Sequence, residues 1–194
     1  MKDGRKNEMA LILAILKSPE IEYNANSLAK LLGLSAMGAL KIARKLEAEN
    51  ILLSRKVGNA KIYSINNENE YANQYIKLLL KKEIEEASPY VKRWIREIQK
   101  IKRAQGSILY GSVLKKEKEA KDIDVLLIVN KNSFEAVKKQ VEEINNLNEK
   151  KIHPLYQTKE DLKKHIKEKN KVILNALKGR MVSGEDTILQ LLCP

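Results

Sequence analysis

Four residues near the middle of the chain have the types and spacing that suit metal and phosphate chemistry. Gly111 and Ser112 follow a short apolar segment, and Asp122 and Asp124 flank an isoleucine where a second apolar segment begins. Because strand side chains alternate, both aspartates are expected on one face, with Cα atoms about 7 Å apart. Carboxylates this close repel each other unless a cation bridges them, and Mg²⁺ takes oxygen ligands of this kind. A glycine leaves room for a phosphate, and a serine hydroxyl and N–H can donate to it, so the sequence predicts a metal and nucleotide site.

The order strand, Gly-Ser, short helix, Asp-x-Asp and strand resembles the nucleotidyltransferase superfamily that includes DNA polymerase beta. The resemblance covers about residues 105–194, and the small minimal nucleotidyltransferases are nearest in size. It implies that Gly111 and Ser112 bind the triphosphate of a nucleotide. It also implies that Asp122 and Asp124 are catalytic and hold Mg²⁺ or Mn²⁺.

The third carboxylate that this family places on a later strand has no clear counterpart in the sequence. The expected next strand, in "KKIHPLYQT", contains no Asp or Glu. Glu160 and Asp161 follow it, but Thr158 with Asp161 resembles a helix cap, so both acids are interpreted as structural. His153 lies near the missing position, where it is either a general base or a plain structural histidine.

Two lysines also depart from the family pattern. Lys116 stands where the family usually has a Gly four residues after the Ser, and Lys121 stands where it usually has a Ser before the first Asp. Lysines at these positions either pair with phosphate or neutralise the aspartates in place of a metal. If the lysines pair with phosphate, the site is expected to work. If they neutralise the aspartates, the site is expected to be inactive.

The chain up to residue 66 has the pattern of helix, helix, tight turn, helix and hairpin. Helices are expected over residues 5–17 and just before Gly33, which suits a left-handed C-terminal position. Ser35 is a good N-cap for a helix that runs to Glu49. The side chains of that helix expected to face the core are Leu40, Ala43 and Leu46. Gly58-Asn59 between two alternating segments predicts a β-hairpin.

Residues 8–66 resemble the winged helix-turn-helix domains of many prokaryotic transcription regulators, in which the helix after the turn enters the major groove. The resemblance implies duplex DNA as a partner, with residues 35–49 as the recognition helix and the hairpin as the wing. The side chains expected to contact DNA are Ser35, Met37, Lys41, Arg44, Lys45, Arg55, Lys56, Asn59 and Lys61. Lys and Arg would neutralise phosphates, whereas the start of the helix offers few polar side chains that read bases. The alternative is that these are solvated charges on a protein-binding adapter.

Residues 67–104 are expected to form a helical connector between domains at 1–66 and 105–194. Helices are predicted over 69–87 and from Pro89 to about Arg103, with Ser88 as N-cap. Both carry apolar stripes, which either pack on a neighbouring domain or pair with a second copy in a homodimer. The predicted fold class is α+β: an N-terminal winged helix-turn-helix, the connector, and a C-terminal nucleotidyltransferase-fold mixed sheet with flanking helices.

Composition and charge narrow the function classes. The formal net charge of +12 is spread along the chain and favours nucleic acid, nucleotides or anionic membranes as partners, without choosing among them. No apolar segment is long enough to span a bilayer, and Met9–Leu16, although it resembles a signal peptide, lacks a small-residue cleavage site. The single cysteine, Cys193, excludes an intrachain disulfide and fits a reducing compartment. A cytoplasmic protein without a membrane partner is expected.

The sequence leads to two main hypotheses of function. In the first, a DNA-binding, transcription-regulatory protein carries a nucleotidyltransferase-fold domain that binds nucleotide and Mg²⁺. In the second, that domain is an active enzyme that moves a nucleoside monophosphate from a nucleoside triphosphate to a hydroxyl of a protein, nucleic acid or small molecule. An adapter or antitoxin-like protein with neither activity is a third hypothesis. The missing third carboxylate favours the first, and the intact Gly-Ser and Asp-x-Asp keep the second open.

Overall fold

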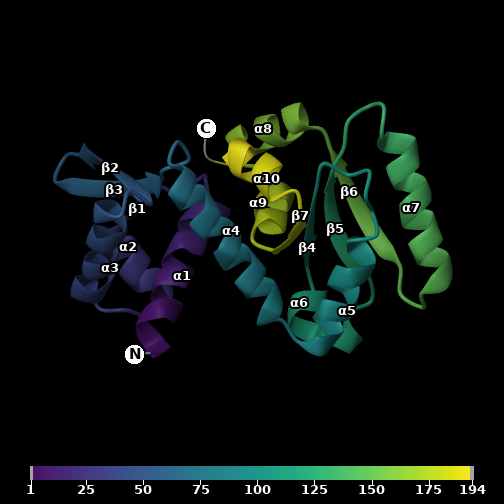
Figure 1. Ribbon diagram of the computed structural model, residues 1–194, viewed down its shortest axis with the longest axis horizontal. Coiled ribbons are helices and arrows are strands. Elements are labelled where there is room, and N and C mark those ends of the chain that lie inside the picture. The colour runs from purple at the N-terminus through teal and green to yellow at the C-terminus, as the bar shows by residue number, and fades with distance from the viewer. Residues whose placement is uncertain (1, 193–194) are drawn as a thin grey trace. The chain divides into compact units, whose positions relative to one another are not determined.

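The structure is a computed structural model that describes residues 2–192, with side chains from residue 4 onward. The described part of the chain forms two compact units, whose elements are labelled in Figure 1. Unit 1 extends to Leu79 and also includes Leu192, and unit 2 is Leu80–Leu191. Cys193 lies outside the described residues. No helix in the described part of the chain is long and apolar enough to cross a membrane.

Unit 1 combines helices with a small antiparallel sheet. Its elements are α1 (Lys2–Lys17), β1 (Tyr23–Asn24), α2 (Ala25–Leu32), α3 (Ala36–Ala48), β2 (Leu52–Val57), β3 (Ala60–Ile65) and the first part of α4 (Glu70–Glu85). The strands lie in the order β1-β3-β2, and β2 and β3 pair from Leu52↔Ile65 to Val57↔Ala60. The hairpin predicted at Gly58 and Asn59 is therefore present.

Local sequence signals set the ends of α2 and α3. Asn24 and Ser27 form a reciprocal capping box at the start of α2. Gly33 ends α2 in the left-handed conformation, with φ 66°. The Ser35 side chain then accepts a hydrogen bond from the Gly38 N–H and caps α3. The stop and cap residues predicted from the sequence are thus in place.

The core-facing side of α3 differs by one position from the prediction. Ala43 and Leu46 are buried as predicted, but the third buried side chain is Ala39, and Leu40 is half-buried. Positions four and three apart stack on one helical face, so Ala39 continues this face and Leu40 lies at its edge. The segment Met9–Leu16 lies in α1 and contributes most of its apolar side chains to the core.

Unit 2 is built on a four-stranded mixed sheet (Figure 1). After the end of α4, its elements are α5 (Pro89–Ile98), β4 (Gly106–Tyr110), α6 (Val113–Lys116), the 3₁₀ turn η1 (Glu117–Glu119), β5 (Ile123–Ile128), α7 (Phe134–Leu147), β6 (Ile152–Gln157), α8 (Lys159–Lys167), α9 (Lys171–Leu177), β7 (Arg180–Ser183) and α10 (Glu185–Leu192). The strand order is β6-β5-β4-β7, with β5 and β6 parallel and the other pairs antiparallel. Helix α7 is the crossover that a parallel pair requires. The mixed sheet with flanking helices predicted here is present.

The apolar stripe of α5 packs in the core of its own unit. Ser88 caps this helix and Pro89 occupies its first turn. The buried side chains on α5 are Val91, Trp94, Ile95 and Ile98, which pack with α7 and one face of the sheet. The helix ends at Ile98, before the expected end near Arg103, because the chain turns there and places Ile101 in the same core.

Candidate functional site

Gly111 lies directly after β4, at a position where the surroundings require glycine. Its φ is 81°, a conformation that residues with a side chain rarely adopt. A Cβ added at this position would lie 2.1 Å from Oδ2 of Asp124. Ser112 follows, and its exposed side chain makes no hydrogen bond with a described residue. The turn therefore presents open backbone and an available hydroxyl next to a carboxylate.

Strand β5 carries the two aspartates to this same end of the sheet. Asp124 is paired in register with Tyr110 of β4, and Asp122 directly precedes β5 and is exposed. Burial raises the pKa of the Asp124 carboxyl above its ordinary value, and the charge of Asp122 adds to this, while nearby His153 opposes it. A bound cation would relieve the cost of ionising this partly buried carboxyl.

His153 lies beside Asp124 on the neighbouring strand β6. The two residues are partners in the parallel register, and His153 Nδ1 is 3.8 Å from Asp124 Oδ1. The histidine side chain is 80% exposed, so it is not a buried structural residue. Glu160 and Asp161 lie beyond the opposite end of β6, where the Asp161 N–H donates to Thr158 Oγ1 in the predicted helix cap. The group nearest the place of a third carboxylate is therefore His153.

Neither Lys116 nor Lys121 neutralises the aspartates. Within the described residues, no lysine or arginine forms an ion pair with Asp122 or Asp124. The idea that these lysines take the place of a metal does not hold in this geometry. The carboxylates remain available for a cation from solution.

A cleft of about 420 Å³ opens beside the Gly-Ser turn. Its lining consists of Tyr110, Gly111, Ser112, Leu114, Lys115, Asn175, Lys178 and Gly179. This nucleotide cleft, as we call it, joins the turn to α9 and the start of β7. Lys115 and Lys178 form no ion pair with a described residue, so the cleft is positive. Lys115, Asn175 and Lys178 were not predictable as site residues, because nothing in the local sequence pattern links α9 to the Gly-Ser turn.

The donor set fits a hard divalent cation that also binds a nucleotide. Among the described residues, no three His, Cys, Asp or Glu side chains are placed to hold a metal by themselves. Mg²⁺ or Mn²⁺ can be held by two carboxylates when phosphate oxygens and water complete its coordination. Gly111, which keeps the approach to Asp124 open, is the structural feature that favours this arrangement.

The residues predicted to contact DNA all lie in unit 1, but three of their cations are paired with carboxylates. The pairs are Lys45 with Glu8, Arg55 with Glu22, and Lys61 with Glu47. Lys41, Arg44 and Lys56 are exposed and form no ion pair with a described residue. Ser35 uses its side chain to cap α3, Met37 is 72% exposed, and Asn59 is exposed at the hairpin turn. Half of the cations expected to contact DNA are therefore paired with a carboxylate of unit 1.

Comparison with known proteins identifies one part of the chain. Residues 91–178 match a family described as "Nucleotidyltransferase domain". The match begins within α5 and includes Gly111, Ser112, Asp122 and Asp124. Unit 2 therefore contains a nucleotidyltransferase domain, and the match does not extend into unit 1. No curated protein and no solved structure matches the chain.

Proposed function

We propose that unit 2 is a Mg²⁺- or Mn²⁺-dependent enzyme that moves a nucleoside monophosphate from a nucleoside triphosphate to an acceptor hydroxyl. The supporting observation is that the Gly111-Ser112 turn and the carboxylates of Asp122 and Asp124 meet at one end of the sheet, with no lysine or arginine of the described chain paired to either aspartate. The family match to residues 91–178 agrees with this assignment.

Each residue of the site has a proposed role. The Ser112 hydroxyl and N–H donate to the phosphates, and Lys115 and Lys178 attract them into the nucleotide cleft. Asp122 and Asp124 would hold the metal, which when bound stabilises the charge on the reacting phosphate. His153, exposed beside Asp124, is placed to accept a proton from the acceptor hydroxyl.

Transfer of radiolabel from α-labelled nucleoside triphosphates tests the proposal. Wild-type protein with Mg²⁺ or Mn²⁺ is expected to label an acceptor and release pyrophosphate, and Asp122→Asn or Asp124→Asn to abolish both. Lys139→Gln, which changes an exposed charge on α7 outside the site, serves as the control and should stay active. Label transfer that persists in Asp124→Asn would contradict the assignment.

The second candidate function is duplex DNA binding by unit 1. The observation that favours it is the element order of unit 1 with a β1-β3-β2 sheet, which resembles the arrangement of a winged helix-turn-helix. We propose that α3 enters the major groove and that Lys41, Arg44 and Lys56 contact phosphates, because these cations have no carboxylate partner. A transcription-regulatory role would follow from such binding.

The salt dependence of DNA binding tests this second candidate. Each phosphate contact contributes about −0.9 to the slope of log K against log salt, so replacing Lys41, Arg44 and Lys56 by Ala should reduce the slope by about 2.7. Replacing Arg55 and Lys61, which are already paired with acids, is the control and should change the slope less. If wild-type protein does not bind duplex DNA at low salt, the adapter alternative replaces this candidate.

A further inference from the structure

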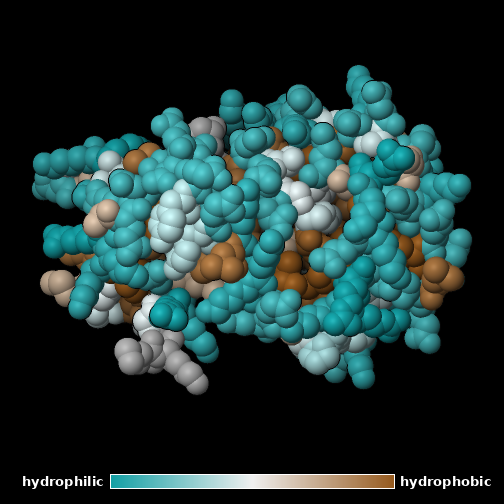
Figure 2. Space-filling view, in the orientation of Figure 1, coloured by the Kyte–Doolittle hydropathy of each residue, from teal (hydrophilic) through white to brown (hydrophobic). Residues whose placement is uncertain are grey.

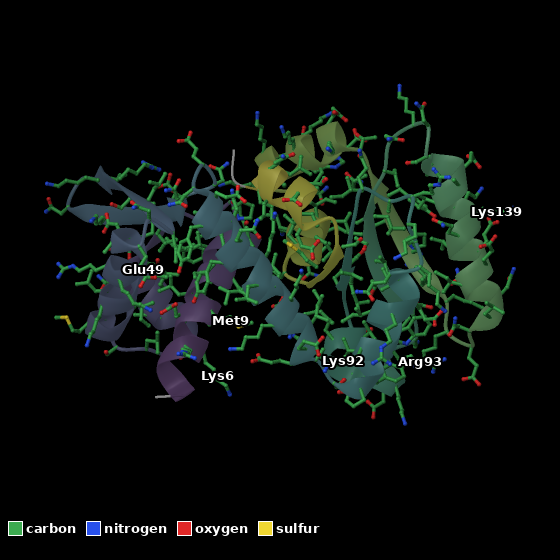
Figure 3. All side chains as sticks on the ribbon, viewed as in Figure 1. Lys6, Met9, Glu49, Lys92, Arg93 and Lys139 are labelled. Atoms are coloured by element: carbon green, nitrogen blue, oxygen red, sulfur yellow. The ribbon has the colours of Figure 1, made fainter. Side chains whose placement is uncertain are left out.

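The second half of α8 and the segment that runs through α9 carry a cluster of lysines. Between residues 163 and 178 the sequence has one carboxylate, that of Glu168. The six lysines of this segment are all exposed, and none forms an ion pair with a described residue. This lysine surface, as we call it, consists of Lys163, Lys164, Lys167, Lys169, Lys171 and Lys178. Helix α7, where Lys139 is labelled in Figure 3, differs because three glutamates accompany its two lysines.

One side of α9 connects the lysine surface to the nucleotide cleft. Lys171, Asn175 and Lys178 are exposed and lie four and three positions apart, so they share one helical face. The buried side chains of α9 form its other face. Asn175 and Lys178 line the nucleotide cleft together with Gly111 and Ser112. One end of the lysine surface is therefore a wall of the nucleotide cleft.

Helix α8 lies on the face of the sheet that carries the reacting groups. His165 on α8 and Gln157 on β6 are joined by a hydrogen bond of 2.7 Å. Side chains alternate along a strand, so Gln157 and His153, four positions apart, point to the same face of β6. Asp124 is the register partner of His153 and shares this face. The helices that carry the lysine surface are therefore on the same side of the sheet as the site.

Lys169 occupies a backbone position that does not favour a lysine. It follows Glu168, the C-cap of α8, and has a φ of 53°, in the left-handed region. Glycine is the usual residue directly after a helix C-cap, because a side chain strains the backbone in this conformation. The end of the helix therefore does not explain the lysine, whereas a role in binding an anion would.

A single-stranded nucleic acid is the partner that fits this surface. At a rise of about 1.5 Å per residue, Lys171 lies about 10 Å along the helix from Lys178, so the surface continues past the cleft that holds the nucleotide. Such a run of exposed cations complements a chain of phosphates. An anionic membrane fits less well, because Val172 is the one large apolar side chain exposed on this described segment. The nucleotide cleft, of about 420 Å³, has the volume of a small-ligand site, so a strand reaches it by an unpaired end and not as a duplex.

We infer that the lysine surface binds single-stranded nucleic acid, and that the terminal hydroxyl of the bound strand is the acceptor of the transferred nucleotide. The second part rests on the proposed transferase function. In this step the hydroxyl oxygen forms a bond to the α-phosphorus, and the bond from that phosphorus to the oxygen it shares with the β-phosphate breaks. Pyrophosphate leaves with that oxygen, and the hydroxyl proton passes to His153.

The salt dependence of oligonucleotide binding locates the surface. Fluorescence anisotropy of a labelled single-stranded RNA should show binding by the full-length protein. The double variant Lys167→Gln/Lys171→Gln should reduce the slope of log K against log salt by about 1.4, because each phosphate contact of a single strand contributes about 0.7. The control Lys138→Gln/Lys139→Gln on α7 makes the same change of net charge and should alter the slope less. Equal slopes in the two double variants would overturn the inference.

The variant Lys169→Gly separates binding from stability. Glycine relieves the left-handed strain, so the variant should be at least as stable as wild type in urea unfolding. It should nevertheless bind the RNA more weakly, with a smaller salt slope, because one cation of the surface is lost. A lysine with a purely structural role would give the opposite result, and unchanged affinity with lower stability would count against the lysine surface.

Two other partners are tested with the same double variants. Binding to vesicles of phosphatidylcholine and phosphatidylserine that is lost in Lys167→Gln/Lys171→Gln, while RNA binding is unchanged, would identify a membrane contact and overturn the inference. An RNA duplex of the same sequence should respond less to this change than the single strand does, because its paired end does not enter the cleft. A larger response of the duplex would overturn the choice of a single strand.

Label transfer from α-labelled nucleoside triphosphates separates this inference from the proposed function. RNA with a free terminal hydroxyl should be labelled in the presence of Mg²⁺ or Mn²⁺, and RNA with a blocked end should not. If the protein labels itself or a small molecule but no strand, the transferase proposal stands and the acceptor part of the inference fails. If RNA binding depends on Lys167 and Lys171 but no label is transferred to any acceptor, the nucleic-acid surface stands and the transferase proposal fails.

Discussion

At the scale of single residues, Gly111 is the position where a one-carbon change should remove nucleotide binding. In Gly111→Ala the new Cβ would meet Oδ2 of Asp124 at 2.1 Å, so the carboxylate must move. The φ of 81° adds strain of about 1–2 kcal/mol. Calorimetry with Mn²⁺ and a nucleoside triphosphate should therefore detect no binding.

The matched control for Gly111 is Gly58→Ala in the hairpin of unit 1. Gly58 also has a positive φ, 57°, but an added Cβ there would have no atom within 4 Å. Both variants should lose stability in urea unfolding, Gly111→Ala more because of its clash with Asp124, and only Gly111→Ala should lose the nucleotide. Wild-type affinity in Gly111→Ala would show that the Gly-Ser turn is not the phosphate site.

The carboxyl of Asp124 should destabilise the fold when it ionises. Because its pKa in the folded protein is raised, the folded state holds this proton more tightly than the unfolded chain does. The stability that this tighter proton binding contributes is present at pH values below the ordinary pKa of 3.8. It is lost as the pH rises through the pKa of Asp124 in the folded protein. Asp124→Asn should therefore raise the free energy of unfolding at pH 7.

Urea unfolding at pH 7 and at mildly acidic pH measures the Asp124 effect, with exposed Asp122→Asn for comparison. The advantage of Asp124→Asn over wild type should shrink as the pH falls and the wild-type carboxyl is protonated. Both variants should lose metal-dependent nucleotide binding. An Asp124→Asn protein that is less stable than wild type at pH 7 would contradict the sign of this argument.

At the scale of elements, a buried carboxylate joins the helices of unit 1. Glu8 on α1 accepts hydrogen bonds from Lys45 on α3 and from the Tyr75 hydroxyl on α4. Burial raises the pKa of Glu8, but these two donors outweigh it and leave the pKa below 4.5. The stability that these hydrogen bonds contribute is present at pH values above the pKa of Glu8 in the unfolded chain. It is lost as the pH falls through the pKa of Glu8 in the folded protein.

Replacing Glu8 should therefore weaken unit 1 at neutral pH and matter less in acid. Glu8→Gln is expected to lower the free energy of unfolding by about 1–3 kcal/mol at pH 7. Glu22→Gln removes an exposed pair with Arg55 and should cost less than about 1 kcal/mol. Urea unfolding at pH 7 and pH 3 distinguishes the two, and an equal loss for Glu8→Gln at both values would count against the ion pair.

At the scale of the whole molecule, the exposed apolar side chains of α4 support the proposal of a homodimer. Tyr71 and Leu78 are two turns apart on this helix and are 58% and 60% exposed, whereas hydrophilic residues cover most of the face seen in Figure 2. Sedimentation at tens of micromolar is expected to show a dimer, and Leu78→Glu to shift it to monomer. Leu147→Glu on α7 is the control, and wild-type monomer alone would end the proposal.

The sequence by itself determined the features that depend only on residues close together along the chain. The end of α2 at Gly33, the Ser35 cap and the Gly58-Asn59 turn were predictable because backbone conformation and capping are local. The Gly-Ser and Asp-x-Asp pattern was also readable, because both parts lie on consecutive antiparallel strands. Hydrophobic periodicity predicted the buried face of α3 less accurately. It selected Leu40, whereas the buried residue is its neighbour Ala39.

Only the tertiary structure decided which distant groups meet. The parallel register of β5 and β6 puts His153 beside Asp124, and no local signal specifies that register. Lys45, expected on a DNA-facing surface, instead bonds to Glu8 because packing of α1 against α3 buries that carboxylate and leaves it in need of a cation. Long-range packing thus determines which groups pair, since a charged side chain or a strand edge interacts with the group that the fold brings close to it.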